Sequence, residues 1–212
     1  MATADKPKRR AKRVDGELSR TRILDAATEI AAERGYEGTS IGAVSAKCGL
    51  PASSIYWHFA DKDDLIAAVI ERSFNNWMAV WQLPEDLVAV DRLMDVATGG
   101  TAKALMESPD FLRLGLMLAL ERRPVEPRAR AMFVKVREEA FDAMSRSLDR
   151  LGIGLTEGQV RELATYAIAG ADGLFIAKEI GGGDAVDLLS LFTLHGQALY
   201  ATAMRMVEEN AR

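Results

Sequence analysis

The amino-acid sequence predicts an all-α protein, and three observations support this prediction. Apolar residues recur every three to four positions along most of the chain after Glu17, which is the period of an amphipathic helix. Capping and breaking residues interrupt the pattern at spacings typical of helices joined by short loops. The β-branched residues are scattered and do not alternate with polar residues over any run, so no strand is expected.

The first helix is expected at residues 17–35, because its apolar residues form a single stripe and Gly35 suits the position just after a helix. A second, short helix is expected from Ile41 to about Lys47. Thr39 and Ser40 precede it, and both are residue types that cap helix N-termini.

A third, short helix follows the second after a tight turn. Gly49 ends the second helix, and the third is expected from about Pro51 or Ala52 to His58. Asp61 is a suitable cap for a longer helix from Lys62 to about Trp81, which must end before Pro84. Further helices are expected at about residues 87–106, 110–122, 127–151, 156–178 and 184–209. The sequence therefore predicts about nine helices.

The charge is distributed unevenly along the chain. The net charge is −4, but residues 1–62 hold 11 basic and 8 acidic side chains, a charge of +3, which leaves −7 for residues 63–212. Six of the basic residues lie between Lys6 and Arg13, where no apolar face accompanies them. This pattern predicts a disordered basic arm at residues 1–16 that faces a polyanion. The alternatives are a chance imbalance and a solvated tail without function.

Composition excludes several other classes of protein. The single cysteine, Cys48, cannot form an intrachain disulfide and fits a reducing cytoplasm, where we expect the protein to act. With two histidines and one cysteine, no metal site and no cofactor are expected. No nucleotide-binding glycine loop or catalytic Ser-His-Asp or Cys-His set can be assembled, so an enzyme is not expected. The longest strongly apolar run, residues 114–120, is much shorter than the ~20 residues that span a bilayer.

The two short helices after the first helix have the arrangement of a helix-turn-helix, whose second helix can enter the major groove of DNA. Ile55 and Phe59 are spaced to face inward on that second helix. The residues left for its outer face are Ser53, Ser54, Tyr56 and His58, with Trp57 at the border. We therefore expect a DNA-binding helix-turn-helix domain at residues 17–62, followed by a helical domain at residues 63–212.

The sequence around these helices closely resembles the N-terminal signature of the TetR family of transcriptional regulators, over about residues 17–70. The resemblance rests on the stretches 35–41 and 44–50, and above all on Ile-Tyr-Trp-His-Phe at 55–59 followed by Asp-Lys-Asp-Asp-Leu at 61–65. Two departures are Cys48, where a small alanine is commoner, and the pair Pro51-Ala52, which lacks a long hydrogen-bond donor.

The resemblance implies roles for individual residues. Thr39 and Ser40 correspond to positions that contact a phosphate, and the bases are contacted by the positions of Ala52, Ser53 and Ser54. The positions of Tyr56, His58 and Lys62 hold the DNA backbone. Alternatives remain for two of these assignments: His58 as a structural residue and Tyr56 as a core residue. Cys48 is interpreted as a small buried filler, and a redox sensor is the alternative.

The resemblance also implies a homodimer and a ligand-binding domain. The dimer contact is expected on about residues 156–178 and 184–208, with no membrane involved. Large apolar residues of the middle helices are either core or the lining of a ligand cavity, and Asp172 is either a polar anchor, a local pair or part of the dimer contact. His195 is assigned equally to the dimer contact and to a cavity. The candidate ligand-binding residues are Phe74, Trp77, Met78, Trp81, Met94, Phe111, Met117, Phe133, Met144 and Asp172.

The function that follows is a DNA-binding regulator, and the resemblance favours a repressor. We expect it to be released from a pseudo-palindromic double-stranded operator by a mostly apolar small-molecule effector. The alternatives are a transcriptional activator of the same fold and a helical interaction module without a ligand response.

Overall fold

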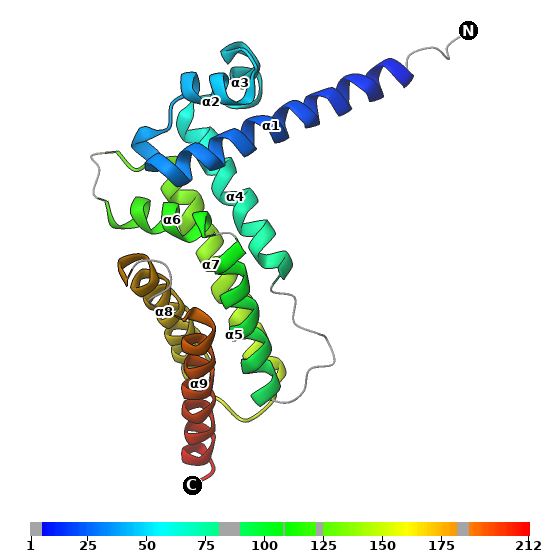
Figure 1. Ribbon diagram of the computed structural model, residues 1–212. Helices are drawn as coiled ribbons and strands as arrows, with labels where there is room; N and C mark the ends of the chain where they lie inside the picture. The colour runs from blue at the N-terminus through cyan, green and yellow to red at the C-terminus, as the bar shows by residue number, and fades with distance from the viewer. Residues whose placement is uncertain (1–5, 81–89, 108, 122–124, 182–186) are drawn as a thin grey trace. The chain divides into compact units, whose positions relative to one another are not determined.

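The computed structural model describes residues 6–80, 90–107, 109–121, 125–181 and 187–212, and for residues 6–14, 80 and 90–97 it describes the backbone alone. These residues form nine α-helices and no strand (Figure 1), which confirms the predicted fold class. The helices are α1 (Lys6–Gly38), α2 (Ile41–Cys48), α3 (Ala52–His58), α4 (Lys62–Val80), α5 (Val90–Glu107), α6 (Asp110–Leu120), α7 (Arg128–Arg150), α8 (Glu157–Gly181) and α9 (Leu188–Asn210). None of the described helices is long and apolar enough to cross a membrane.

Side-chain caps explain where α2 and α9 begin. The Ser40 side chain accepts a hydrogen bond from the backbone N–H of Ala43 and so caps α2. The α9 helix is capped in the same way by Asp187, which accepts from the N–H of Ser190. Sequence analysis placed this last cap at Asp184, which lies outside the described residues.

The basic arm is the main difference between the predicted and the observed elements. Residues 6–16, expected to be disordered, belong to α1, which begins at Lys6. Arginine, lysine and alanine are good helix formers, and a proline is tolerated in the first turn, so the helix can extend without burying an apolar face. The lack of apolar residues therefore does not indicate disorder here, because helix propensity favours the helix without an apolar face.

The chain divides into two compact units. The first, which we call the head, comprises Met1–Ser73 and Arg113–Val134, and the second, the body, comprises Phe74–Leu112 and Lys135–Arg212. The boundary expected between residues 62 and 63 therefore falls inside the head. Three helices, α4, α6 and α7, contribute residues to both units.

The head is built on a core that α1 to α4 share. Helices α1, α2 and α3 pack against one another in pairs. Their fully buried side chains include Ile23 of α1, Val44 of α2 and Ile55 of α3, and α4 adds Leu65 and Ile70. Because these residues repeat at helical spacing, the burial of one face leaves the opposite face of each short helix to solvent.

The body is a bundle in which α9 packs against α5 and α8 (Figure 1). One cluster of its core joins Leu148 of α7, Leu163 and Ala167 of α8, and Leu199 and Ala203 of α9. Leu199 therefore faces the interior of the body and is not available for contact with a second chain.

Asp63 connects three helices of the head. Its carboxylate accepts hydrogen bonds from the backbone N–H groups of Arg128 and Ala129, the first two residues of α7. It also accepts from the Tyr36 hydroxyl at 3.1 Å. The Arg128 side chain forms an ion pair with Asp61, two residues before Asp63. Asp63 thus caps α7, although it belongs to the first turn of α4.

We expect Asp63→Ala to lower the free energy of unfolding by about 1–2 kcal/mol, because it removes the cap of α7 and the acceptor of the Tyr36 hydroxyl. Chemical denaturation followed by circular dichroism measures this change. Asp142→Ala is the matched control, since Asp142 is an acidic residue of α7 that lies far from the start of the helix. An equal effect of the two substitutions would show that the cap does not contribute to stability.

Candidate nucleic-acid interface and ligand cavity

The turn between α2 and α3 is fixed by a glycine and by two side chains. Gly49 has a φ of 67°, in the left-handed region, and its N–H donates to the carbonyl of Ser45. Arg22 of α1 donates to the carbonyl of Cys48 at 2.7 Å, and the Ser45 hydroxyl donates to the carbonyl of Leu50 at 2.7 Å. The Cys48 side chain is itself buried, in agreement with its interpretation as a filler. These bonds hold α3 at a defined angle to α2.

The outer face of α3 is exposed and carries polar and aromatic side chains. Ile55 and Phe59 point into the core of the head, as predicted. On the opposite face Ser53 is exposed, Tyr56 is 56% exposed and Trp57 is 74% exposed. The exposure of Tyr56 contradicts the alternative that it is a core residue. Trp57, which the sequence placed at the border, is the most exposed large side chain of this helix.

The other candidate residues of α3 are half-buried, namely Ala52, Ser54 and His58. Burial of the His58 ring lowers its pKa, and the positive charge of Arg20 lowers it further. The neutral form of His58 is therefore favoured near neutral pH. A neutral ring can donate one hydrogen bond to a phosphate, but it supplies no positive charge.

Thr39 and Ser40 differ in what they expose. The Thr39 side chain is 1% exposed, and its hydroxyl donates to the carbonyl of Gly35 at 2.8 Å. Its backbone N–H donates to the carbonyl of Tyr36. Both of its donors are used inside the head, so the expected phosphate contact of Thr39 requires correction: it positions the start of α2. Ser40 is exposed and remains a candidate.

Lys62 lies beside the C-terminal end of α1. Its ammonium donates to the carbonyl of Tyr36 at 3.2 Å and lies 4.3 Å from the centroid of the Tyr36 ring. The carboxylate of Glu37 is 3.6 Å away. Since an ammonium has three donors, these contacts orient Lys62 without preventing a further bond to an anion.

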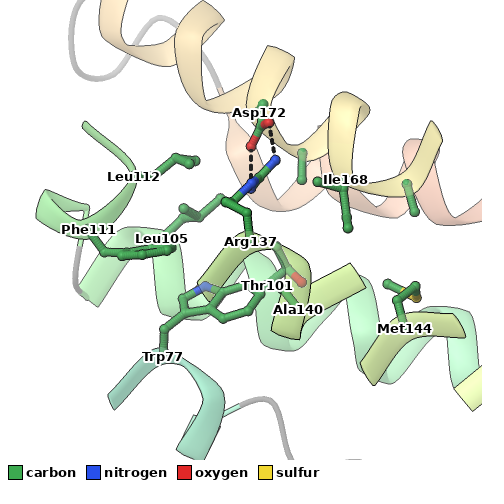
Figure 2. Close-up of a pocket in the computed structure, with 12 residues that line it drawn as sticks. Trp77, Thr101, Leu105, Phe111, Leu112, Arg137, Ala140, Met144, Ile168 and Asp172 are labelled. Carbon is green, nitrogen blue, oxygen red and sulfur yellow. Dashed lines mark hydrogen bonds and ion pairs between the residues drawn. The ribbon is translucent and has the colours of Figure 1, made fainter. Parts of the chain in front are cut away.

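The body contains a cavity whose empty space, counted together with the solvent at its open mouth, is about 590 Å³. Trp77, Phe111, Met144 and Asp172, four of the predicted ligand-binding residues, line it (Figure 2). The remaining lining residues are Thr101, Leu105, Leu112, Arg137, Ala140, Ala167, Ile168 and Ala171.

The other predicted ligand-binding residues lie elsewhere or outside the described side chains. Phe74 is buried against the rings of Trp77 and Phe111 and so supports the wall of the cavity from behind. Met78 is half-buried and is not a lining residue. Trp81 and the side chain of Met94 fall outside the described residues.

Two predicted ligand-binding residues belong to the head and require correction. Met117 is half exposed and approaches Gly35, where an added Cβ would lie 3.1 Å from the methyl carbon of Met117. Phe133 packs over Gly115 so closely that a Cβ at Gly115 would lie 2.0 Å from its ring. Both residues were chosen for their size and softness, properties that a core requires as much as a cavity does.

Arg137 is the functional candidate that sequence analysis missed. It reaches from α7 to Asp172 on α8, and its two terminal nitrogens bond the two carboxylate oxygens, one of them at 3.0 Å (Figure 2). Burial raises the pKa of Asp172, although the charge and the hydrogen bond of Arg137 oppose this rise. The sequence does indicate an unusual arginine here, because Arg137 adjoins the apolar stripe of Phe133, Val136 and Ala140, which faces the core.

A second cavity, of about 410 Å³, adjoins the first. The two cavities share Thr101, Met144, Ala167 and Ala171 in their linings. The second also contains His195, whose Nε2 lies 3.1 Å from the carbonyl oxygen of Ala167. His195 therefore lines a cavity, one of the two positions expected for it.

Helices α8 and α9 carry apolar side chains that the body leaves exposed. Ile180 of α8 is 82% exposed, and Leu194 of α9 is 60% exposed. Tyr166 and Ile176 of α8 and Tyr200 of α9 are exposed as well. Exposed apolar side chains gathered on two neighbouring helices are typical of an interaction surface.

Comparison with known proteins finds similarity to bacterial regulators, with a family match to one part of the head. Residues 23–69 match the family described as bacterial regulatory proteins, tetR family. The HTH-type transcriptional regulator AcrR of Shigella flexneri is 36% identical over 62 residues, which cover 29% of this chain and 29% of AcrR. The HTH-type transcriptional repressor AcnR of Corynebacterium diphtheriae is 28% identical over 174 residues, covering 81% of this chain and 86% of AcnR.

Solved structures share the fold along most of the chain. SmeT, the repressor of the Stenotrophomonas maltophilia multidrug efflux pump SmeDEF, has a TM-score of 0.67 at 24% identity, covering 86% of this chain and 88% of SmeT. A SmeT–triclosan complex has a TM-score of 0.70 at 22% identity, covering 87% of this chain and 90% of that one.

The alignments with the first curated relatives span less than half of those proteins, 29% and 46%. The chain carries the N-terminal helix-turn-helix domain of the TetR family of bacterial regulatory proteins.

Proposed function

We propose that this chain is a DNA-binding transcriptional regulator and not an enzyme, and that it inserts α3 into the major groove of an operator in the cytoplasm. The observation that carries this proposal is the outer face of α3, which exposes Ser53, Tyr56 and Trp57 within a segment that matches the TetR family. A major groove about 12 Å wide admits one α-helix, and the rigid turn at Gly49 supports its docking.

The proposed DNA contacts follow from exposure and chemistry. Ser53, with Ala52 and Ser54 beside it, is assigned to base edges, because these residues lie in the first turn of α3. Ser40, Tyr56, His58 and Lys62 are assigned to phosphates, which accept hydrogen bonds from hydroxyl, imidazole and ammonium groups. The basic residues between 6 and 13 are assigned to the DNA backbone, where they add affinity without sequence preference.

We propose that the chain acts as a homodimer joined through α8 and α9. A regulator that reads a pseudo-palindrome needs two copies of its reading helix about 34–36 Å apart. The exposed apolar side chains of α8 and α9, among them Ile176, Ile180 and Leu194, support this assignment, because a two-fold contact would remove them from water.

We further propose that the regulator is a repressor and that a small molecule in the body releases it from DNA. Two relatives in the comparisons, AcnR and SmeT, are named repressors, and SmeT has a complex with triclosan. The cavity lined by Trp77 and Phe111 suits a mostly apolar effector. Helices α4, α6 and α7 contribute to both units, so a ligand that shifts them in the body also acts on the head.

The proposed phosphate contact of Lys62 is tested by salt dependence. We expect Lys62→Gln to reduce the slope of log affinity against log salt concentration by about 1, because one fewer counterion is released on binding. The measurement is a salt titration with a fluorescent duplex that the protein selects from a random pool. Lys135→Gln, at an exposed lysine of α7 in the body, is the matched control and should leave the slope unchanged. An unchanged slope in Lys62→Gln would remove this lysine from the interface.

The dimer assignment is tested at Leu194. We expect Leu194→Glu to produce a folded monomer, because a charge at an exposed position is harmless in one chain but costly when a second chain covers it. Sedimentation velocity measures the oligomeric state, and circular dichroism checks the fold. Val125→Glu, at an exposed apolar residue of the head, is the control and should leave the dimer intact. A Leu194→Glu protein that sediments as the unaltered dimer would contradict the assignment.

A further inference from the structure

The ion pair in the cavity wall raises the question of what charge a ligand there would carry. Among the described residues that line the cavity, Arg137 and Asp172 are the charged ones, and the others are apolar or uncharged. Both side chains are largely buried, with 26% and 19% of their surfaces exposed. A buried charge is costly without a partner. A ligand that binds one member of the ion pair therefore adds the cost of the charge that it leaves on the other member.

The two members of the pair differ in this respect. An arginine stays protonated in proteins, so a cationic ligand that took Asp172 would leave Arg137 charged and without its carboxylate. A carboxylate can take up a proton and become neutral. Burial already raises the pKa of Asp172, which makes this neutralisation easier. The site therefore accommodates an anion at Arg137 at lower cost than a cation at Asp172.

Two adjoining cavities favour a ligand that extends from one into the other. They share four lining residues, and one of these is Met144. Methionine has three rotatable bonds and adapts its shape at low cost, so this shared wall can yield to a ligand. The first cavity offers the rings of Trp77 and Phe111 as apolar contacts, and the second offers Phe192 and Leu199.

We propose that the effector is an elongated apolar molecule with one acidic head group, and that Arg137 binds this group by exchanging Asp172 for it. The inference rests on the proposed function, since it names the ligand class of the same cavity. Asp172 then takes a proton from solvent and becomes neutral beside the bound anion. Thr101 and the neighbouring apolar side chains contact the rest of the molecule.

Binding should consequently depend on pH. Loss of Arg137 and the approach of a second anion both raise the pKa of Asp172, so the complex holds up to about one proton more than the free protein. Affinity for an anion should therefore fall as pH rises, by at most about tenfold per pH unit. Among the described residues that line the two cavities, the other side chains that can carry a charge are Arg137 and His195 of α9.

The test compares three probes of equal chain length by isothermal titration calorimetry: decanoate, decanol and decyltrimethylammonium. We expect decanoate to bind at least about tenfold more tightly than the other two, because a hydrogen-bonded ion pair forms only with the carboxylate. Its affinity should fall between about pH 6 and pH 8, where the probe itself stays ionised. Repeating the titration in buffers of different ionisation enthalpy measures the proton taken up.

Variants separate the roles of the two residues. Asp172→Asn should abolish the pH dependence, whereas a dependence due to His195 would persist. The double variant Arg137→Gln with Asp172→Asn removes both charges of the ion pair together. No charge of the pair is then left buried alone, so we expect the fold to be kept. This variant should lose the preference for decanoate. Glu138→Gln, at the exposed neighbour of Arg137 on α7, is the control and should change neither property.

Several results would overturn the proposal. Tighter binding of decyltrimethylammonium, absence of binding by all three probes, or a preference for decanoate that survives in the double variant would each do so. A pH dependence that persists in Asp172→Asn would also overturn it. DNA affinity of the same protein is measured separately. A chain that binds decanoate with the expected pH dependence but binds no DNA would support this inference and contradict the proposed function.

Discussion

The carboxylate of Asp63 ties three helices of the head together. This one group accepts bonds from the N-terminus of α7 and from the Tyr36 hydroxyl at the end of α1, while it belongs to the start of α4. Helix N-termini expose N–H groups that need partners, and a buried or half-buried N-terminus without partners is costly. Asp63 thereby anchors the start of α4, which follows α3 after a short turn, and the bond from Arg22 to the carbonyl of Cys48 anchors the turn before α3. The reading helix thus lies between two anchors whose partners are far apart in sequence.

The interior of the body contains two charged side chains, Arg137 and Asp172, at positions where apolar groups would pack at lower cost. A buried ion pair adds little stability compared with well-packed apolar residues, so its presence in a cavity wall favours a functional explanation. Within the pair the charges of Arg137 and Asp172 balance each other, and only the carboxylate can lose its charge by taking up a proton. This asymmetry is what assigns the acidic ligand.

Much of this structure could be predicted from periodicity and capping residues, and the reasons for the failures are physical. The inward positions Ile55 and Phe59 and the turn at Gly49 follow from local spacing. Contacts between helices do not follow from local spacing, so the ion pair of Arg137 with Asp172 was missed. Phe133 was assigned to the cavity although it belongs to the head, because large apolar residues suit a core and a cavity alike. Thr39 was expected to contact DNA, since a sequence does not reveal that a hydroxyl is already bonded to the preceding turn.

The central claim is that two copies of α3 read an operator as a symmetric pair. The most direct measurement is selection of bound duplexes from a random DNA pool, followed by sequencing, with the unaltered chain and with its Ser53→Ala variant. The account predicts that the selected duplexes converge on an inverted repeat whose half-sites lie about 10 base pairs apart or a multiple of this. Ser53→Ala should change the preferred bases within each half-site. Selected duplexes without a common sequence, or a single half-site without symmetry, would contradict the account.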